Sequence, residues 1–338
     1  MNMKAGALTT AMLCGAVLLT GGLVMADTFG TGTNQFTIKF VTISGATNPT
    51  SGIPAGYGFT FTGVNNAYRM GTYEVTNDQW DKFKTILVVP VTGVPSNAYD
   101  QNPFWTGTNV PTNNVSWYEA AQFVNWLNTS TGHQAAYKFT GTQGTGDYTL
   151  ATWSTAEADN GTNLYRHKDA KYYLPTENEW VKAAYWNGIS LQTYATKAGE
   201  SLTQGEGTFG TGWNYYTTHY ATPPLPIITN PFGPWAVGSG SQELNGTYDM
   251  MGNLWEWMES PYWSGDYGTA SDRGLRGGSY DPGGYYDLAS FVRFSNYLDS
   301  LGEDFDVGFR VASEVPEPAI LSLLSMGGLA LLRRRSRR

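Results

Sequence analysis

The chain has 338 residues, with 28 acidic against 20 basic side chains, 41 glycines, 22 tyrosines and 12 tryptophans. This excess of acid argues against a protein that binds nucleic acid through a basic surface. The composition also lacks the Ala, Leu, Glu and Lys bias of helical proteins. The only cysteine, Cys14, lies near the amino terminus, so the rest of the chain offers no disulfide, thiolate metal ligand or thiol nucleophile.

Residues 1–26 have the pattern of a secretory signal peptide. Lys4 precedes an apolar run from Ala11 to Met25, and small residues end at Ala26. We expect cleavage after Ala26. Residues 27–57 are then an amino-terminal β extension, in which Phe36–Ile43 (FTIKFVTI) is the clearest strand.

Three helices are predicted by the same start signal, the capping box. In this box a hydroxyl side chain caps the helix, and Glu or Gln three residues later bonds back to it. The boxes begin at Thr76, Ser116 and Thr176. Apolar residues at helical spacing follow each box and are expected to face the core: Trp80, Phe83 and Leu87; Trp117, Ala121, Val124 and Leu127; Trp180, Ala183 and Ala184.

Two long spans, residues 129–163 and 188–241, are rich in Gly, Thr, Asn and Pro without a sustained period. They are too aromatic for typical disorder, so we expect ordered loops held by aromatic packing.

The stretch Asn245–Trp257 (NGTYDMMGNLWEW) combines two carboxylates, Asp249 and Glu256, with Gly252. Glycine lets the backbone turn so that carbonyl oxygens face inward, and calcium binds such mixtures of carboxylate and carbonyl oxygens. The alternative is a plain core strand with packing tryptophans and surface acids. Spacing alone favours that alternative, because the loop pattern of an EF-hand is absent.

Other charged groups give weaker signals. The three histidines, His133, His167 and His219, are widely spaced and lack a metal-binding motif. Arg276 and Arg310 are predicted to form structural ion pairs with buried carboxylates, Glu256 being one candidate for a partner. A cluster of acids, Glu303, Asp304 and Asp306, is typical of a solvated turn.

The carboxyl-terminal segment, residues 314–338, has three parts. Pro316, Glu317 and Pro318 precede an uncharged run at residues 319–332, and five arginines follow. The run is shorter than the roughly 20 residues of a permanent membrane span, and the arginines would hold its end in the cytoplasm.

This order resembles the PEP-CTERM sorting tail. The resemblance implies an exosortase-type processing enzyme as partner and transient anchoring in the inner membrane through residues 319–332. It also implies export to the cell surface or extracellular matrix of a Gram-negative-type bacterium. A simple anchor is the alternative, but it leaves the Pro-Glu-Pro motif unexplained. Without Lys4 and the five arginines, 14 basic side chains face 28 acidic ones, a charge near −14 that suits solubility or cation binding.

Six blocks occur in order between residues 58 and 313: YRMGTYEVTNDQW, PTNNVSWYEAAQFVNWLN, YYLPTENEWVKAAYW, NGTYDMMGNLWEW, LRGGSY and VGFRVAS. Together they resemble the formylglycine-generating enzyme (sulfatase-modifying factor) family. The resemblance implies an α+β, C-type-lectin-like domain over residues 58–313, with few helices and little regular secondary structure. The family also includes ergothioneine-synthase-type enzymes and binding proteins, so the fold alone does not decide the function.

Active members of that family oxidise a substrate cysteine with oxygen, using copper held by two cysteines. The equivalent positions here fall on Pro282 and Asp287, which do not suit Cu(I). We therefore predict neither copper nor iron as a cofactor, and no working formylglycine-generating oxidase. Ser279, Tyr286 and Trp255 match neighbouring positions of the family's pocket, so a cleft with altered chemistry is expected.

The resemblance also implies a structural calcium site. Its ligands would be Asp249, the carbonyls of Gly252 and Leu254, and Glu256, which reverses the preference for a plain strand. A second family site would begin at Asn214, but its aspartate cannot be placed before Pro223.

Two functions from different classes remain. The first is an exported, calcium-stabilised module that binds a polysaccharide or peptide through aromatic side chains placed at the surface. The second is an oxidoreductase of the formylglycine-generating or ergothioneine-synthase type, with altered metal chemistry that acts on protein or small-molecule thiols. The second requires histidines to converge with Ser279, Tyr286 and Asp287, and we favour the first.

Overall fold

The computed structural model describes residues 25–87, 102–142, 145, 147–215, 233–268, 271–281, 285–295 and 302–316. The signal-peptide segment up to residue 24, His219, Pro223, Pro282 and the tail from Glu317 onwards lie outside these residues. What the sequence predicts for them stays a prediction. Within the described residues, none of the helices combines the length and the hydropathy that a membrane crossing requires.

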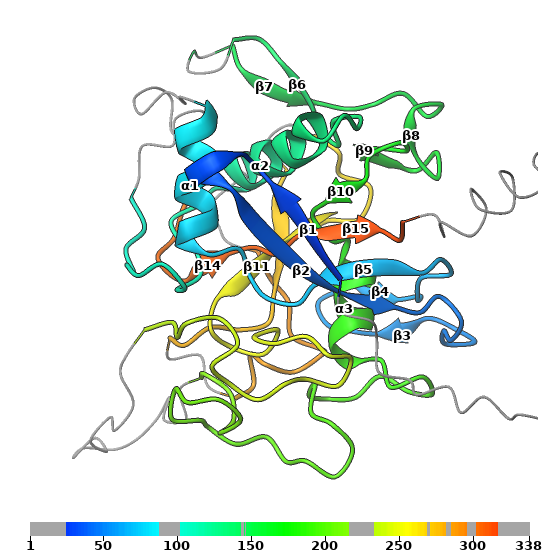
Figure 1. Cartoon of the computed structure of the whole chain (residues 1–338). Helices are drawn as coiled ribbons and strands as arrows, with labels where there is room; N and C mark the ends of the chain where they lie inside the picture. Colours follow the sequence, from blue (N-terminus) through cyan, green and yellow to red (C-terminus); the bar gives the residue numbers. More distant parts are fainter. Residues whose placement is uncertain are drawn as a thin grey trace, which may run out of the picture.

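The larger sheet joins the two ends of the domain. Its five strands are antiparallel and run in the order β1-β2-β5-β15-β10 (Figure 1). Their bounds are β1 Met25–Phe29, β2 Phe36–Ile43, β5 Tyr68–Gly71, β15 Ala312–Glu314 and β10 Tyr172–Tyr173. The predicted strand at residues 36–43 is confirmed as β2, with alternating inward and outward side chains over its first five residues.

The three predicted helices are confirmed at their predicted starts. They are α1 Asn77–Leu87, α2 Trp117–Ser130 and α3 Glu177–Tyr185. Ser116 and Thr176 form complete capping boxes with Glu119 and Glu179, and the Thr76 amide donates to Gln79 in the same way. All the predicted core-facing residues are buried except Leu87, which is 39% exposed because α1 ends there.

Aromatic side chains make up much of the core between the helices and the sheet. Phe36 of β2 packs against Phe123 and Trp126 of α2, and Trp80 of α1 contacts Phe309. Most of the tryptophans are buried, and Trp263, at 61%, is the strongly exposed one among the described residues. The expectation of abundant surface tryptophans is therefore wrong. The chain has few helices, and the tryptophan rings supply much of the apolar volume of its core.

A second sheet has four strands. Its order is β13-β12-β11-β14, with β14 parallel to β11. The bounds are β11 Trp255–Pro261, β12 Arg273–Arg276, β13 Phe294–Ser295 and β14 Val307–Gly308. β11 begins at Trp255, near the end of the Asn245–Trp257 stretch, and is covered on both faces. Its acid Glu256 is therefore fully buried rather than at the surface.

The remaining strands form three two-stranded ribbons. These pair β3 Ile53–Pro54 with β4 Thr60–Phe61, β6 Lys138–Thr140 with β7 Thr149–Ala151, and β8 Ala158–Asp159 with β9 Asn163–His167. A 3-10 turn, η1, covers Gly32–Asn34. The span 129–163 thus contains short strands, whereas the described part of 188–241 has only isolated bridges. The prediction of ordered loops is confirmed for that part.

Candidate functional site

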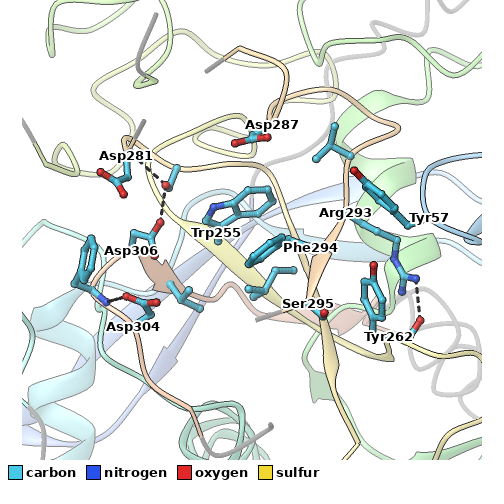
Figure 2. Close-up of a pocket in the computed structure, with 15 residues that line it drawn as sticks. Tyr57, Trp255, Tyr262, Asp281, Asp287, Arg293, Phe294, Ser295, Asp304 and Asp306 are labelled. Carbon is cyan, nitrogen blue, oxygen red and sulfur yellow. Dashed lines mark hydrogen bonds between the residues drawn. The ribbon is translucent and has the colours of Figure 1, made fainter. Parts of the chain in front are cut away.

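A cavity of about 580 Å³ opens at the edge of the second sheet, and we name it the Trp255 pocket. Trp255 of β11, Leu275 of β12, Phe294 of β13 and Val307 of β14 form its floor and walls. Figure 2 shows Trp255 and Phe294 in its centre, Asp281, Asp304 and Asp306 to one side, and Tyr57, Tyr262 and Arg293 to the other. The other lining residues are Ser279, Asp287, Val292, Ser295 and Phe305.

Three of the five pocket positions expected from the sequence meet here. Ser279, Trp255 and Asp287 all line the Trp255 pocket. Tyr286 is 60% exposed and stacks on Tyr285 outside the lining. The structure thus brings three of these residues to one cavity, Asp287 among them. Their correspondence to the family's pocket and copper ligands stays a prediction.

Asp306 corrects the interpretation of its acidic cluster as a solvated turn. Together with Asp304 it lines the Trp255 pocket, and it accepts a hydrogen bond of 2.8 Å from the Ser279 hydroxyl. Burial raises the pKa of Asp306 to about 6, and the neighbouring charges of Asp304 and Asp281 add to the rise. Burial and Asp304 likewise raise the pKa of Asp281. The sequence missed this gathering because the acids come from separate loops.

Arg293 is the one basic side chain among the residues described as lining the pocket. Its guanidinium is held by Glu177 of α3 through bonds of 2.8 and 2.7 Å, and it also donates to the Tyr262 carbonyl. Glu177 pairs in addition with Arg276, also a predicted ion-pair former. Glu177 thus offsets part of the positive charge of Arg293 from behind the pocket and shares its own negative charge with Arg276.

A second constellation surrounds Arg310, beneath β11. Its guanidinium binds both oxygens of Glu256 at 2.6 and 2.5 Å and donates to the carbonyls of Gly71 and Tyr248. The Trp180 indole completes the shell of Glu256 at 2.8 Å. The predicted ion pair between Arg310 and Glu256 is confirmed, and both partners are 0% exposed.

Three further buried acids face this ion pair: Glu74, Glu243 and Asp249. Burial raises the pKa of Glu243 to about 8 and that of Asp249 to about 6, and it raises the pKa of Glu74 strongly. Four carboxyl groups therefore share one guanidinium. The sequence did not single out Glu74 or Glu243, which lie outside the calcium motif.

The predicted calcium ligands fit this region in part. Asp249 accepts the Gly238 amide through Oδ2, and its Oδ1 has no hydrogen-bond partner among the described residues. Gly252 has a positive φ of 81°, and a Cβ there would come within 2.0 Å of the Asn214 carbonyl, as expected for a required glycine. An excess of acid and a carboxylate oxygen that is not hydrogen-bonded suit a hard cation, but Glu256 is already fully engaged.

The other predicted metal sites find less support in the described residues. No group of three His, Cys, Asp or Glu side chains there converges as a metal site would. His133 lies against Tyr172 and His167 against Trp153, and neither lines the Trp255 pocket. The Asn214 amide donates to Gly233 and Asn253, so its side chain supports a loop.

Replacing Glu243 with Gln is expected to raise the melting temperature at pH 9 and to change it little at pH 5. The pKa of Glu243 is raised to about 8 in the fold, so between about 4.5 and 8 the native state holds a proton that the unfolded state releases. The raised pKa of Glu243 therefore stabilises the fold fully below pH 4.5, and this stabilisation is lost as the pH rises towards 8. Thermal melts in EDTA across this range check it, with Glu200→Gln, on the surface, as control; equal shifts at both pH values would contradict it.

The fold and the pocket define the class of the protein: a formylglycine-generating-enzyme-like, C-type-lectin-like domain. The family described as "Sulfatase-modifying factor enzyme 1-like domain" matches residues 41–315. The chain belongs to this family.

Known proteins agree with this assignment. The bovine (Bos taurus) protein named "Inactive C-alpha-formylglycine-generating enzyme 2" is 32% identical over 152 residues, which are 43% of this chain and 45% of the bovine protein. Treponema denticola variable protein 1 has a similar structure, with a TM-score of 0.55 and 21% identity, over 86% of this chain and 99% of its own. PvdO from Pseudomonas aeruginosa follows at 0.54 and 16%, over 86% and 98%. At these identities the structures show the fold alone.

Proposed function

We propose that this protein is an exported binding module of the sulfatase-modifying factor family that does not oxidise cysteine. The observation that carries the proposal is the Trp255 pocket. This cavity is lined by aspartates and aromatic rings and includes Asp287, where the resemblance would put a copper ligand. A cavity of this size suits a small ligand or a peptide side chain.

Three further facts support a binding role over the oxidoreductase alternative. The only cysteine of the chain is Cys14, so export with signal cleavage would leave no thiolate for copper. His133 and His167 lie outside the pocket, so neither provides a ligand for an iron ion there. The bovine relative is itself named inactive.

Export and sorting are part of the proposal. Signal cleavage after Ala26 would leave β1 starting at Asp27, whose carboxylate binds Arg69 and Tyr172. The last described strand, β15, ends two residues before Pro316. The sorting motif would therefore follow the sheet directly, within reach of a processing enzyme at the membrane. Mass spectrometry of the cell-surface form tests both cleavages.

We also propose that calcium stabilises the region around Asp249. The residues that would hold it are Asp249, Gly252, Leu254 and Glu256, and Glu256 would share its carboxylate with Arg310. Calcium would offset the acid excess around Arg310, which lowers the free energy of the ionised carboxylates. Asp249 is thus the ligand on which binding depends most.

Metal analysis of the protein purified without chelator tests both parts of the proposal. We expect calcium near one equivalent, no copper or iron, and a lower melting temperature in EDTA that calcium restores. Asp249→Asn should abolish the EDTA response, whereas Asp169→Asn, on the surface, should retain it. Bound copper or iron, or oxygen consumption with a thiol peptide, would overturn the binding-module proposal. An EDTA response unchanged in Asp249→Asn would overturn the calcium site.

A further inference from the structure

Three aromatic side chains that line the Trp255 pocket are exposed, and Trp255 itself is only partly buried where it packs against the core. Trp255 and Phe294 lie 5.7 Å apart at a ring angle of 32°. Phe294 is 42% exposed, Phe305 39% and Tyr57 69%, although most rings of this protein are buried. Exposed ring faces around a cavity provide apolar contact and attract cations through the π system.

The charges of the same cavity are mostly negative. Asp281, Asp287, Asp304 and Asp306 line it, and the positive charge of Arg293 is offset in part by Glu177, which Arg276 shares. The hydrogen-bond donors to two of these acids bring no positive charge: Asp306 accepts from the Ser279 hydroxyl, and Asp304 accepts from the Phe305 amide. An anionic ligand would be repelled here, and a neutral sugar would leave the charge uncompensated.

The positions of the acids indicate that the pocket suits an organic cation rather than a metal ion. Among the described residues no three acids converge closely enough for metal coordination. Asp281, Asp304 and Asp306 instead lie along one side of a cavity of about 580 Å³, with Trp255 and Phe294 beside them (Figure 2). A group with a charged end and an apolar stem can contact both sides at once.

We propose that the Trp255 pocket binds an ammonium or guanidinium group on an aliphatic stem, with the charge at Asp304 and Asp306 and the stem on Trp255 and Phe294. This inference rests on the proposed binding function and names its ligand class. The cation is supplied either by a free amine or by the Lys or Arg side chain of a peptide, since both sources offer the same chemistry.

Calorimetric titration of the purified protein tests the ligand class. The probes are agmatine and the peptide acetyl-Gly-Arg-Gly-amide. The neutral counterpart of agmatine is n-pentylurea, in which a urea replaces the guanidinium group and a methyl group replaces the ammonium group; in the neutral peptide, citrulline replaces arginine. We expect at least tenfold tighter binding of the charged member, and affinity that falls with added salt. Preference for agmatine identifies a free amine as the source, and preference for the peptide identifies a protein side chain.

Variants then assign the site. Asp306→Asn and Asp304→Asn should each weaken cation binding several-fold, Trp255→Leu should weaken it as well, and Trp255→Phe should restore most of it. Asp169→Asn, on the surface far along the chain, is the control and should change nothing. Equal binding of the charged and neutral isosteres, or unchanged affinity in Asp306→Asn, would overturn the inference.

The pH profile gives an independent readout. Asp306 faces Asp304, Asp281 and the Ser279 hydroxyl, and burial raises its pKa to about 6. Cation affinity should therefore rise from pH 5 to 7.5 as Asp306 loses its proton, and Asp306→Asn should flatten this rise. A wild-type affinity that does not change with pH would contradict the role of Asp306.

Failure of the inference can be told apart from failure of the proposed function. If a panel of neutral glycans binds in a manner that Trp255→Leu abolishes, while the charged probes do not bind, the cation inference is wrong and the binding module stands. If neither the cations nor the glycans bind, both proposals fail.

Discussion

Arg310→Met is expected to destabilise the protein by about 3–5 kcal/mol, because it leaves a buried carboxylate without its partner. Arg310 satisfies both oxygens of Glu256, and its positive charge also acts on Glu74, Asp249 and Glu243. Its loss leaves four carboxyl groups in a region closed to water. Denaturant unfolding in EDTA measures the free energy of unfolding directly.

The double variant Arg310→Met with Glu256→Gln separates lost charge pairing from lost packing. It should recover part of the stability, because the glutamine carbonyl can still accept from the Trp180 indole. Recovery stays partial, since the carbonyls of Gly71 and Tyr248 lose their donor. Lys84→Met, which removes an exposed ion pair with Asp81, should cost less than about 1 kcal/mol. A double variant as unstable as the single one would refute the role of charge pairing.

The same variant bears on calcium. If calcium lies at Asp249, it offsets part of the uncompensated acid, and the loss in Arg310→Met should be smaller with calcium than in EDTA. Equal losses in the two conditions would place any bound calcium away from this cluster.

Local sequence signals predicted the local structure well. The capping boxes at Thr76, Ser116 and Thr176 depend on residues three apart, so each helix start could be derived without the fold. Strand β2 shows period-two alternation over its first residues in the sequence. The ion pair between Arg310 and Glu256 was also predictable. Each residue lies in a largely apolar sequence block, and a charged side chain that is buried there needs a partner of opposite charge.

The chemistry of the pocket could be predicted only in outline. The family blocks placed Ser279, Trp255 and Asp287 together, because those residues lie in or beside matching motifs. Asp304 and Asp306 looked like a solvated turn, since their place beside the Trp255 pocket depends on β14 pairing in parallel with β11. That pairing joins residues far apart in the chain, and no local pattern reports it.

The burial of the aromatic residues was misjudged for a similar reason. In a chain with few helices, loops rich in Gly and Thr supply little apolar volume, so tryptophans fill the core that Leu and Ile fill elsewhere. Trp80, Trp117, Trp180 and Trp257 are each at most 2% exposed. The rings that remain exposed around Trp255 stand out against this background, which is why they point to a ligand.

Glu177→Gln is expected to lower stability by about 3–5 kcal/mol and to weaken cation binding at a pocket that Glu177 does not line. Glu177 is the first residue of α3, is 0% exposed and pairs with both Arg276 and Arg293. Its loss would leave two buried guanidinium groups uncompensated. Arg293 would then present an unbalanced positive charge to the Trp255 pocket and oppose the charge of a cationic ligand.

Unfolding free energy and agmatine titration, measured on the same samples, separate the two effects. Arg293→Met in the Glu177→Gln background removes the repelling charge, so cation affinity should return toward the wild-type value although the protein stays destabilised. Glu200→Gln, which changes an exposed acid, should alter neither quantity. If Glu177→Gln leaves cation affinity unchanged, Arg293 does not set the charge of the pocket, and the acids of the opposite wall act alone.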